Sequence, residues 1–365
     1  MISPPPNPLP QGEGELTNLI KSRIRQDGPM PISEYMALAL AHPEHGYYIR
    51  RDPLGVQGDF TTAPEISQIF GELIGAWLVI QWVLMGKPQA ALAEIGPGRV
   101  TLMADILRAT SGVKGFHEAI SVHLMEISTA LRQKQWNTLA GKHPDINWHT
   151  GFAEIPAKPL LLVANEFFDA LPIRQFMHTD LGWREKRIGL SEKDELEFIF
   201  TAEPPPDILK DAPISDRPYE YSEAASKMMI VIANRIASYG GVGLIIDYGY
   251  EGSHGNTLQS VRQHAFHDVL VEPGTADITA HVDFHNLTLA AAEGGSFIYG
   301  PIHQGEWLNR LGAKERVTAL CEKAKAKQKK ELLAGLARLT ASDQMGQLFK
   351  VLCVTHPSMP KPEGF

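Results

Sequence analysis

Short apolar runs alternate with amphipathic stretches through the middle of the chain. Residues 160–164, Leu-Leu-Leu-Val-Ala, contain no polar side chain, which is typical of a strand covered on both faces of a sheet. Strands that alternate with helices predict parallel βαβ units, and so an α/β fold with a doubly wound, mostly parallel sheet. The predicted strands are residues 90–95, 121–125, 146–149, 160–164, 242–246 and 348–355, and the predicted helices between them are residues 101–109, 128–139 and 222–239.

The pattern changes on both sides of the fourth predicted strand. Residues 13–41, with a break at residues 27–29, and residues 66–85 have helical spacing. The Gly-, Pro- and aromatic-rich residues 42–64 between them are typical of a functional loop. Residues 176–178, 183–188 and 196–200 alternate apolar and polar side chains, which predicts antiparallel strands. We therefore expect three parts: an N-terminal arm with helices and a lid loop packed on the core (1–88), the core itself (89–173 and 222–365), and an inserted β-rich cap (174–221).

Composition narrows the class of protein. The 365 residues carry a net charge of −8, so the chain lacks the excess of cations that nucleic-acid binding needs. Two cysteines, Cys321 and Cys353, cannot build a disulfide framework and suit a reducing compartment. No apolar run approaches the ~20 residues that span a bilayer. We expect a cytoplasmic protein without membrane insertion.

A glycine turn follows the first predicted strand, in the segment Glu94-Ile-Gly-Pro-Gly-Arg99. Gly96 and Gly98 would let the backbone approach a ligand closely, and the following helix N-terminus adds free N–H groups. A dinucleotide fingerprint would carry a third glycine at Thr101. The spacing Glu-x-Gly-x-Gly is more similar to the S-adenosylmethionine motif of Rossmann-like methyltransferases, which commonly continues with a glycine where this chain has Val100. Glu94 would anchor the turn or an amino group of the cofactor; a tight turn without a ligand is the alternative.

Carboxylates follow two further predicted strands. Glu126 ends the second strand and could accept both ribose hydroxyls of an adenosyl cofactor. Asn165, Glu166 and Asp169 follow the fourth strand, where paired carboxylates could hold a planar guanidinium and localise a lone pair on one nitrogen. This arrangement predicts methyl transfer to arginine by positioning and electrostatics, with Glu166 and Asp169 as catalytic residues. The alternative is that Asp169 only caps a helix.

Two more aspartates are predicted to complete the cofactor site. Asp247 follows the fifth predicted strand, and Asp59 lies in a loop that could fold over the cofactor. The histidine pairs His42/His45 and His264/His267 have no third ligand at a metal-site spacing, so no metal is expected.

Several longer segments resemble the MidA-like family of S-adenosylmethionine-dependent methyltransferases, which includes the mitochondrial complex I assembly-factor arginine methyltransferase. The matching segments are Pro31-Ile-Ser-Glu-Tyr-Met36, His42-Pro-Glu-His-Gly-Tyr-Tyr48, Gly58-Asp-Phe-Thr-Thr-Ala-Pro-Glu-Ile-Ser67, Glu94-Ile-Gly-Pro-Gly98, Asn165-Glu-Phe-Phe-Asp-Ala-Leu-Pro172, Ile246-Asp-Tyr-Gly249 and Asp277-Ile-Thr-Ala-His-Val-Asp-Phe284.

The resemblance implies a Rossmann-like class I methyltransferase core that uses S-adenosyl-L-methionine. It also implies symmetric dimethylation of an arginine on a respiratory complex I subunit. Because the first residues do not have the pattern of a mitochondrial transit peptide, we expect a bacterial cytoplasmic protein. Two alternatives remain: a non-catalytic complex I assembly chaperone, and an NAD-dependent oxidoreductase. The sequence leaves the oligomeric state open, with a dimer as one possibility.

Overall fold

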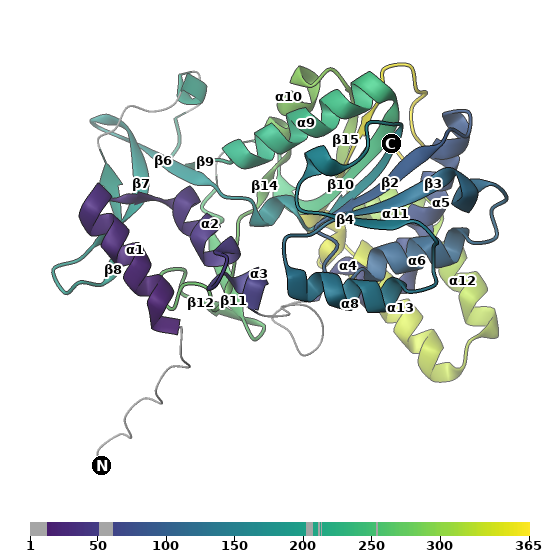
Figure 1. Ribbon diagram of the computed structural model, residues 1–365, viewed down its shortest axis with the longest axis horizontal. Coiled ribbons are helices and arrows are strands. Elements are labelled where there is room, and N and C mark those ends of the chain that lie inside the picture. The colour runs from purple at the N-terminus through teal and green to yellow at the C-terminus, as the bar shows by residue number, and fades with distance from the viewer. Residues whose placement is uncertain (1–12, 51–60, 202–206, 211, 213, 253–254) are drawn as a thin grey trace, which may run out of the picture.

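A central eight-stranded sheet organises the computed structural model, which describes residues 13–50, 61–201, 207–210, 212, 214–252 and 255–365 (Figure 1). The strand order is β15-β16-β10-β5-β2-β3-β4, with β14 paired to the end of β10. Neighbours from β10 to β4 are parallel, and β16 is antiparallel to both β10 and β15. The predicted doubly wound, mostly parallel sheet is thus confirmed. The bounds are β2 Ala90–Ile95, β3 Ile120–Met125, β4 Ile146–His149, β5 Leu160–Asn165, β10 Gly241–Tyr250, β14 Val282–Asp283, β15 Phe297–His303 and β16 Phe349–Thr355.

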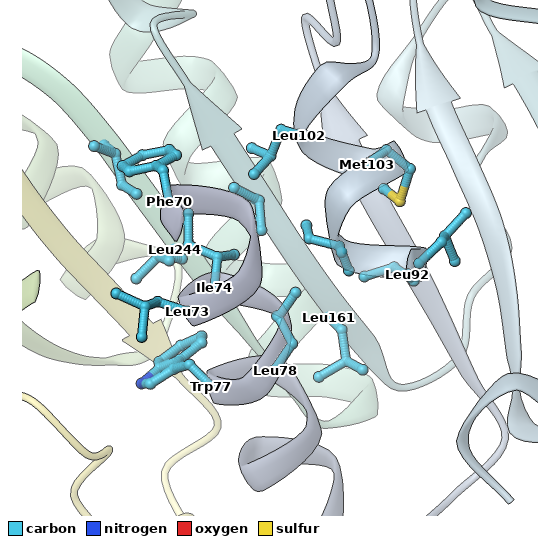
Figure 2. Close-up of a cluster of buried hydrophobic side chains, with 14 of the residues drawn as sticks. Phe70, Leu73, Ile74, Trp77, Leu78, Leu92, Leu102, Met103, Leu161 and Leu244 are labelled. Carbon is cyan, nitrogen blue, oxygen red and sulfur yellow. The ribbon is translucent and has the colours of Figure 1, made fainter. Parts of the chain in front are cut away.

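Apolar side chains on both faces of β5 explain its place at the centre of the sheet. Successive side chains of a strand point to opposite faces. Leu161 and Val163 therefore join one hydrophobic cluster, and Leu160 and Leu162 join another. The first cluster packs under α5 (Gln68–Leu84) and α6 (Thr101–Thr110), and the second under α9 (Glu223–Tyr239) and α10 (Phe284–Glu293). Figure 2 shows side chains of α5, including Ile74 and Leu78, against the sheet.

The remaining core helices extend these layers. Trp307 of α11 and Leu339 of α13 belong to the same cluster as α5. None of the helices in the described ranges is long and apolar enough to cross a membrane. The helices not yet bounded are α4 Ala63–Ile66, α7 Phe116–Ala119, α8 Thr129–Leu139, α11 Gln304–Arg310, α12 Ala313–Lys323, α13 Ala326–Thr340 and α14 Met345–Leu348, with short 3-10 turns η1 Phe152–Glu154, η2 Phe168–Ala170 and η3 Asp207–Leu209.

The insertion forms a separate antiparallel sheet, as its alternating pattern predicts. Its order is β1-β7-β6-β9, with β8 paired to β7. The sequence did not predict the two short strands β1 and β9. Strand β1 comes from the N-terminal region and pairs Met30 with Ile188. The strands are β1 Met30–Pro31, β6 Arg174–Thr179, β7 Gly182–Leu190, β8 Leu196–Thr201 and β9 Tyr219–Tyr221.

The first helices pack with this second sheet. Leu16 and Ile20 of α1 (Glu13–Asp27) and Ile32 of α2 (Ile32–Ala41) share a buried cluster with Ile188 of β7. In Figure 1 α1 and α2 lie beside β6–β8, far from the C-terminal helices. Helix α5, in contrast, covers the central sheet. A third small sheet lies near α2 and α3 (Tyr47–Arg50). Its strand order is β12-β11-β13, and the strands are β11 Gln259–Arg262, β12 Ala265–His267 and β13 Asp277–Thr279.

Candidate active site

A cavity of about 290 Å³ opens at the carboxyl ends of β2, β3 and β5. Parallel strands end at the same edge of a sheet, and ligands of open α/β sheets bind there. Three carboxylates that end these strands, Glu94, Glu126 and Glu166, line the cavity together with Asn165. Gly96 and Gly98 form part of the same lining. Six of the predicted site residues are therefore brought together.

The glycine turn between β2 and α6 has a left-handed backbone at three positions. The φ angles are +65° at Gly96, +52° at Gly98 and +57° at Val100. A Cβ atom on Gly96 would lie 2.8 Å from Cδ2 of Phe167, so this position requires glycine. Val100 occupies the N-cap of α6 with its side chain fully buried. It thus adopts a conformation that glycine adopts readily and that is strained for a β-branched residue.

Glu94 is a buried carboxylate with an unused oxygen. Its Oε2 atom has no hydrogen-bond partner among the described residues. Burial raises the pKa of Glu94 to about 8, although a hydrogen bond from the backbone of Met103 acts in the opposite direction. Asn165 likewise has an unpartnered Oδ1 atom in the described structure. Both oxygens can accept hydrogen bonds from a ligand in the cavity.

Glu126 has its hydrogen-bond partners in place. Its Oε1 atom accepts from the backbone N–H of Ser128 at 2.8 Å, and its Oε2 atom accepts from Nε2 of Gln135 at 3.0 Å. Arg132 donates from Nε to the backbone carbonyl of Glu126 at 2.8 Å. Helix α8 therefore fixes both the backbone and the carboxylate of this residue. Burial raises the pKa of Glu126, and the two donors lower it in part.

Glu166 has a strained backbone directly after β5. Its φ is +50°, a left-handed value that is uncommon for residues other than glycine and that tends to occur at functional sites. Its Oε1 atom accepts from the backbone N–H of Ala63 and from Nδ2 of Asn165, both at 3.1 Å. Burial raises the pKa of Glu166 to about 8, and the neighbouring Asp169 raises it further.

Asp247 and Asp169 do not line the cavity. Asp247 is fully buried, and its Oδ2 atom accepts from the backbone N–H groups of Phe167, Phe168 and Asp169 at 3.0–3.3 Å. It therefore fixes the 3-10 turn η2 that follows Glu166. Asp169 is also buried; burial raises its pKa to about 6, while a hydrogen bond from Tyr248 lowers it. Asp59 lies outside the described residues.

One wall of the cavity was not predicted from the sequence. It is apolar and consists of Met36, Ala37, Leu40 and Ala41 of α2 with Leu171 and Pro172 after η2. Tyr48 also lines the cavity, and its hydroxyl donates to Oδ1 of Asp277 at 2.8 Å. The segments containing Tyr48 and Asp277 are both among the family motifs of the sequence. Their contact could not be predicted, because the two residues are 229 positions apart in the chain.

The donor set fits S-adenosyl-L-methionine. This cofactor carries a sulfonium and an ammonium group, so buried carboxylates with free acceptor oxygens, such as Glu94, suit it. Within the described ranges, no group of three or more His, Cys, Asp or Glu side chains could hold a metal ion.

Comparison with known proteins agrees with this geometry. Residues 73–302 match the model of an S-adenosyl-L-methionine-dependent methyltransferase family. The chain is 37% identical to the mitochondrial protein arginine methyltransferase NDUFAF7 of Xenopus tropicalis, over 96% of this chain and 89% of the relative. It is 36% identical to the human protein of the same name, over 90% of this chain and 80% of that relative.

The fold is that of a class I methyltransferase. A crystal structure of a Burkholderia thailandensis protein bound to S-adenosyl-homocysteine superposes with a TM-score of 0.84, covering 98% of this chain and 97% of that one at 23% identity. The chain belongs to the S-adenosyl-L-methionine-dependent methyltransferase family, together with the mitochondrial arginine methyltransferases. The family resemblance in the motifs is thereby confirmed, and the NAD-dependent oxidoreductase alternative is disfavoured.

Proposed function

We propose that the chain transfers methyl groups from S-adenosyl-L-methionine to the guanidinium of a protein arginine, giving symmetric dimethylarginine. The observation that carries the proposal is Glu166, a half-buried carboxylate with a left-handed backbone on the cavity wall. The next residue, Phe167, packs against Gly96 of the glycine turn, so Glu166 lies next to the part of the cavity proposed to hold the cofactor. The names of the relatives support arginine as the acceptor.

The proposed cofactor contacts are distributed over the strand ends. Glu94, Gly96, Gly98, Glu126 and Asn165 would hold the cofactor from the cavity lining, with Glu126 on the ribose. The cofactor supplies an electrophilic methyl group on its sulfonium. Two further residues are proposed to contribute. Asp247 lies off that lining and fixes the turn beside the site. Asp59 lies outside the described residues.

Glu166 and Asp169 are proposed to orient the guanidinium, Glu166 by direct contact from the cavity lining and Asp169 from behind that lining. Carboxylates attract the positive charge to the nitrogens they contact, which leaves a lone pair on the remaining nitrogen. Methylation releases one proton from the guanidinium, and a carboxylate with a pKa of about 8 is suited to accept it near neutral pH. The negative charge of nearby Asp169 adds to burial in raising the pKa of Glu166.

The apolar wall suits the stem of an arginine side chain. Three methylenes precede the guanidinium, and Met36, Leu40 and Leu171 offer an apolar surface beside Glu166. A lysine stem would fit the same wall, so the wall alone does not select arginine. The planar guanidinium is selected by the Glu166 carboxylate on the cavity wall, whose two oxygens can bind it bidentately.

We propose a subunit of respiratory complex I as the protein substrate and the bacterial cytoplasm as the place of action. The motif resemblance to the complex I assembly-factor branch supports the first proposal. A screen of separately purified complex I subunits with radiolabelled S-adenosyl-L-methionine tests it. Label on arginine of one subunit is the expected result, and label on none of the subunits would contradict it.

Substitution of the central carboxylate tests the activity. Glu166→Gln keeps the shape of the side chain but cannot become an anion. We expect methyl transfer to fall by about 100-fold or more, because the anion that forms beside the cationic guanidinium is lost. Isothermal titration with S-adenosyl-L-methionine should show a dissociation constant within a few fold of wild type. The exposed Glu322→Gln on α12 is the matched control.

Two outcomes would contradict this assignment. Unchanged methyl transfer in Glu166→Gln would exclude Glu166 as a catalytic residue. A Glu166→Gln, Asp169→Asn double variant that is inactive but still supports complex I assembly in cells would favour the chaperone alternative.

A further inference from the structure

Helix α8 contains a buried amide in an otherwise apolar stripe. Leu131, Gln135 and Leu139 are spaced four apart and are the buried residues of this helix. Gln135 has no exposed surface. Burying an unbonded amide destabilises the fold, so a leucine would be the ordinary choice at the middle position. The contacts of Gln135 explain the glutamine.

Each polar group of the Gln135 amide is used. Its Nε2 atom donates to Oε2 of Glu126 at 3.0 Å and to the backbone carbonyl of Gly98 at 2.8 Å. Its Oε1 atom accepts from Nε1 of Trp148 at 2.8 Å. An indole N–H can only donate, so Trp148 fixes the orientation of the amide. Both amide hydrogens therefore point to the cofactor side.

These contacts connect two parts of the cavity lining that come from different strands. Glu126 ends β3, and Gly98 belongs to the turn after β2; both line the cavity. Gln135 itself does not line the cavity. It can influence a bound molecule only through Glu126 and the glycine turn. The other oxygen of Glu126 is held by the backbone N–H of Ser128.

We propose that Gln135 is a positioning residue that sets the affinity of the site for the ribose of its cofactor. It holds the Glu126 carboxylate and the glycine turn in one fixed arrangement. Without it, the carboxylate can rotate and the turn loses a donor to its carbonyl. The proposal rests on the proposed contact of Glu126 with the ribose.

Binding of two nucleosides separates this role from a general structural one. The probes are S-adenosyl-homocysteine and its 2′-deoxyribose analogue, titrated calorimetrically into the full chain. In wild type the deoxy analogue should bind more weakly, because a hydroxyl partner of Glu126 is missing. In Gln135→Met we expect S-adenosyl-homocysteine to lose about tenfold in affinity, with a smaller loss for the analogue. The ratio of the two constants should therefore approach one.

Further variants serve as controls. Gln133→Met lies on the exposed face of the same helix and should leave both constants unchanged. Gln135→Glu places an acceptor against two acceptors and should weaken S-adenosyl-homocysteine more than Gln135→Met does. Trp148→Phe removes only the indole donor to Gln135, so the ratio of the two dissociation constants should drop less than in Gln135→Met. If thermal unfolding shows that the Gln135 variants do not fold, Trp148→Phe provides the test.

The outcomes distinguish the proposal from its premise. Equal weakening of both probes in Gln135→Met would show a general structural role and overturn the proposal. Glu126→Gln is measured in parallel. If it leaves the ratio unchanged, the ribose contact of Glu126 is refuted and the proposal falls with it. If Glu126→Gln brings the ratio of the two dissociation constants to one and Gln135→Met leaves it at the wild-type value, only the role of Gln135 is refuted.

Discussion

The two ends of the cavity hold their buried carboxylates in different ways. At the α8 end, defined by Glu126, Gly98 and Gln135, both carboxylate oxygens already have donors from the protein. At the β5 end, defined by Glu94, Asn165 and Glu166, two side-chain oxygens have no partner among the described residues. Desolvation favours the neutral acid, so the pKa values of Glu94 and Glu166 rise to about 8, although Oε1 of Glu166 accepts two hydrogen bonds.

The difference distinguishes two ways of preparing a binding site. The α8 end is preorganised, so little rearrangement accompanies binding of a neutral sugar. The β5 end has acids whose negative charge develops fully only when a cation arrives. This difference between the two ends fits a cofactor that carries a neutral ribose together with a positive sulfonium and a positive ammonium group. It also fits a substrate that carries a positive guanidinium.

Gly96→Ala should have the largest effect, because Gly96 lies where the two ends meet. The left-handed backbone costs an alanine about 1–2 kcal/mol, and crowding against Phe167 adds about 1–3 kcal/mol. We expect the free energy of unfolding to fall by about 2–5 kcal/mol in urea denaturation. Gly86→Ala, with φ +83° and nothing within 4 Å of its Cβ, is the matched control and should show the backbone cost alone.

Phe167→Leu in the Gly96→Ala background removes part of the crowding and should restore part of the lost stability. Equal losses in Gly96→Ala and Gly86→Ala would show that the contact with Phe167 is unimportant.

The pH dependence of cofactor binding should come from the β5 end. The pKa of Glu94 is about 8 in the folded protein, so this group is mostly protonated at pH 6. Binding of a cationic cofactor favours the ionised form. Affinity should therefore rise with pH, by up to about tenfold per unit between pH 6 and 8, and level off above pH 8. Titration calorimetry in two buffers of different ionisation enthalpy measures the proton released.

Glu94→Gln separates this effect from titration of the cofactor itself. The variant should bind more weakly at pH 8 and should lose the part of the pH dependence that Glu94 provides. The stability of the free protein should change in the opposite sense. A folded pKa raised above the unfolded value means that stability falls as pH rises from about 4.5 to about 8. Identical pH profiles for Glu94→Gln and wild type would refute the assignment.

The smallest predicted effect concerns Val100 at the glycine turn. At most positions glycine is about 0.5–1 kcal/mol less favourable than alanine. At φ +57° the order should reverse, so that Val100→Gly is more stable than Val100→Ala by about 1 kcal/mol. Urea denaturation of both variants measures the difference. If alanine is the more stable, the turn at the α8 end is not strained.

The central sheet could be predicted because its strands are apolar on both faces. The pattern of residues 160–164 is unambiguous, and the structure extends it by one residue to Asn165. Strand β10 was predicted to end at residue 246 but continues to Tyr250, because β14 and β16 pair with its polar end. Short strands such as β1 have too few residues to show a period.

In the candidate site too, residues at strand ends could be predicted from the sequence, and contacts that depend on tertiary packing could not. Glu94, Glu126 and Glu166 meet because parallel strands end at one edge, which a sequence pattern can reveal. Asp247 was predicted at the same edge. Its place within β10 turns its carboxylate to backbone N–H groups instead of the cavity. The α2 wall was missed because it depends on tertiary packing between distant segments, and Gln135 was missed because it acts behind the lining.

The pairing of Met30 with Ile188 has a consequence for how the protein is made. Ribosomes add about 5–20 residues per second, so the N-terminal strand waits on the order of 10–30 s for its partner to be synthesised. Until then the apolar sides of α1 and α2 have no inserted sheet to cover them. A nascent chain therefore exposes an apolar surface until the inserted sheet has been synthesised, while the first part of its catalytic core is being translated, and this is the interval in which a general chaperone would be needed.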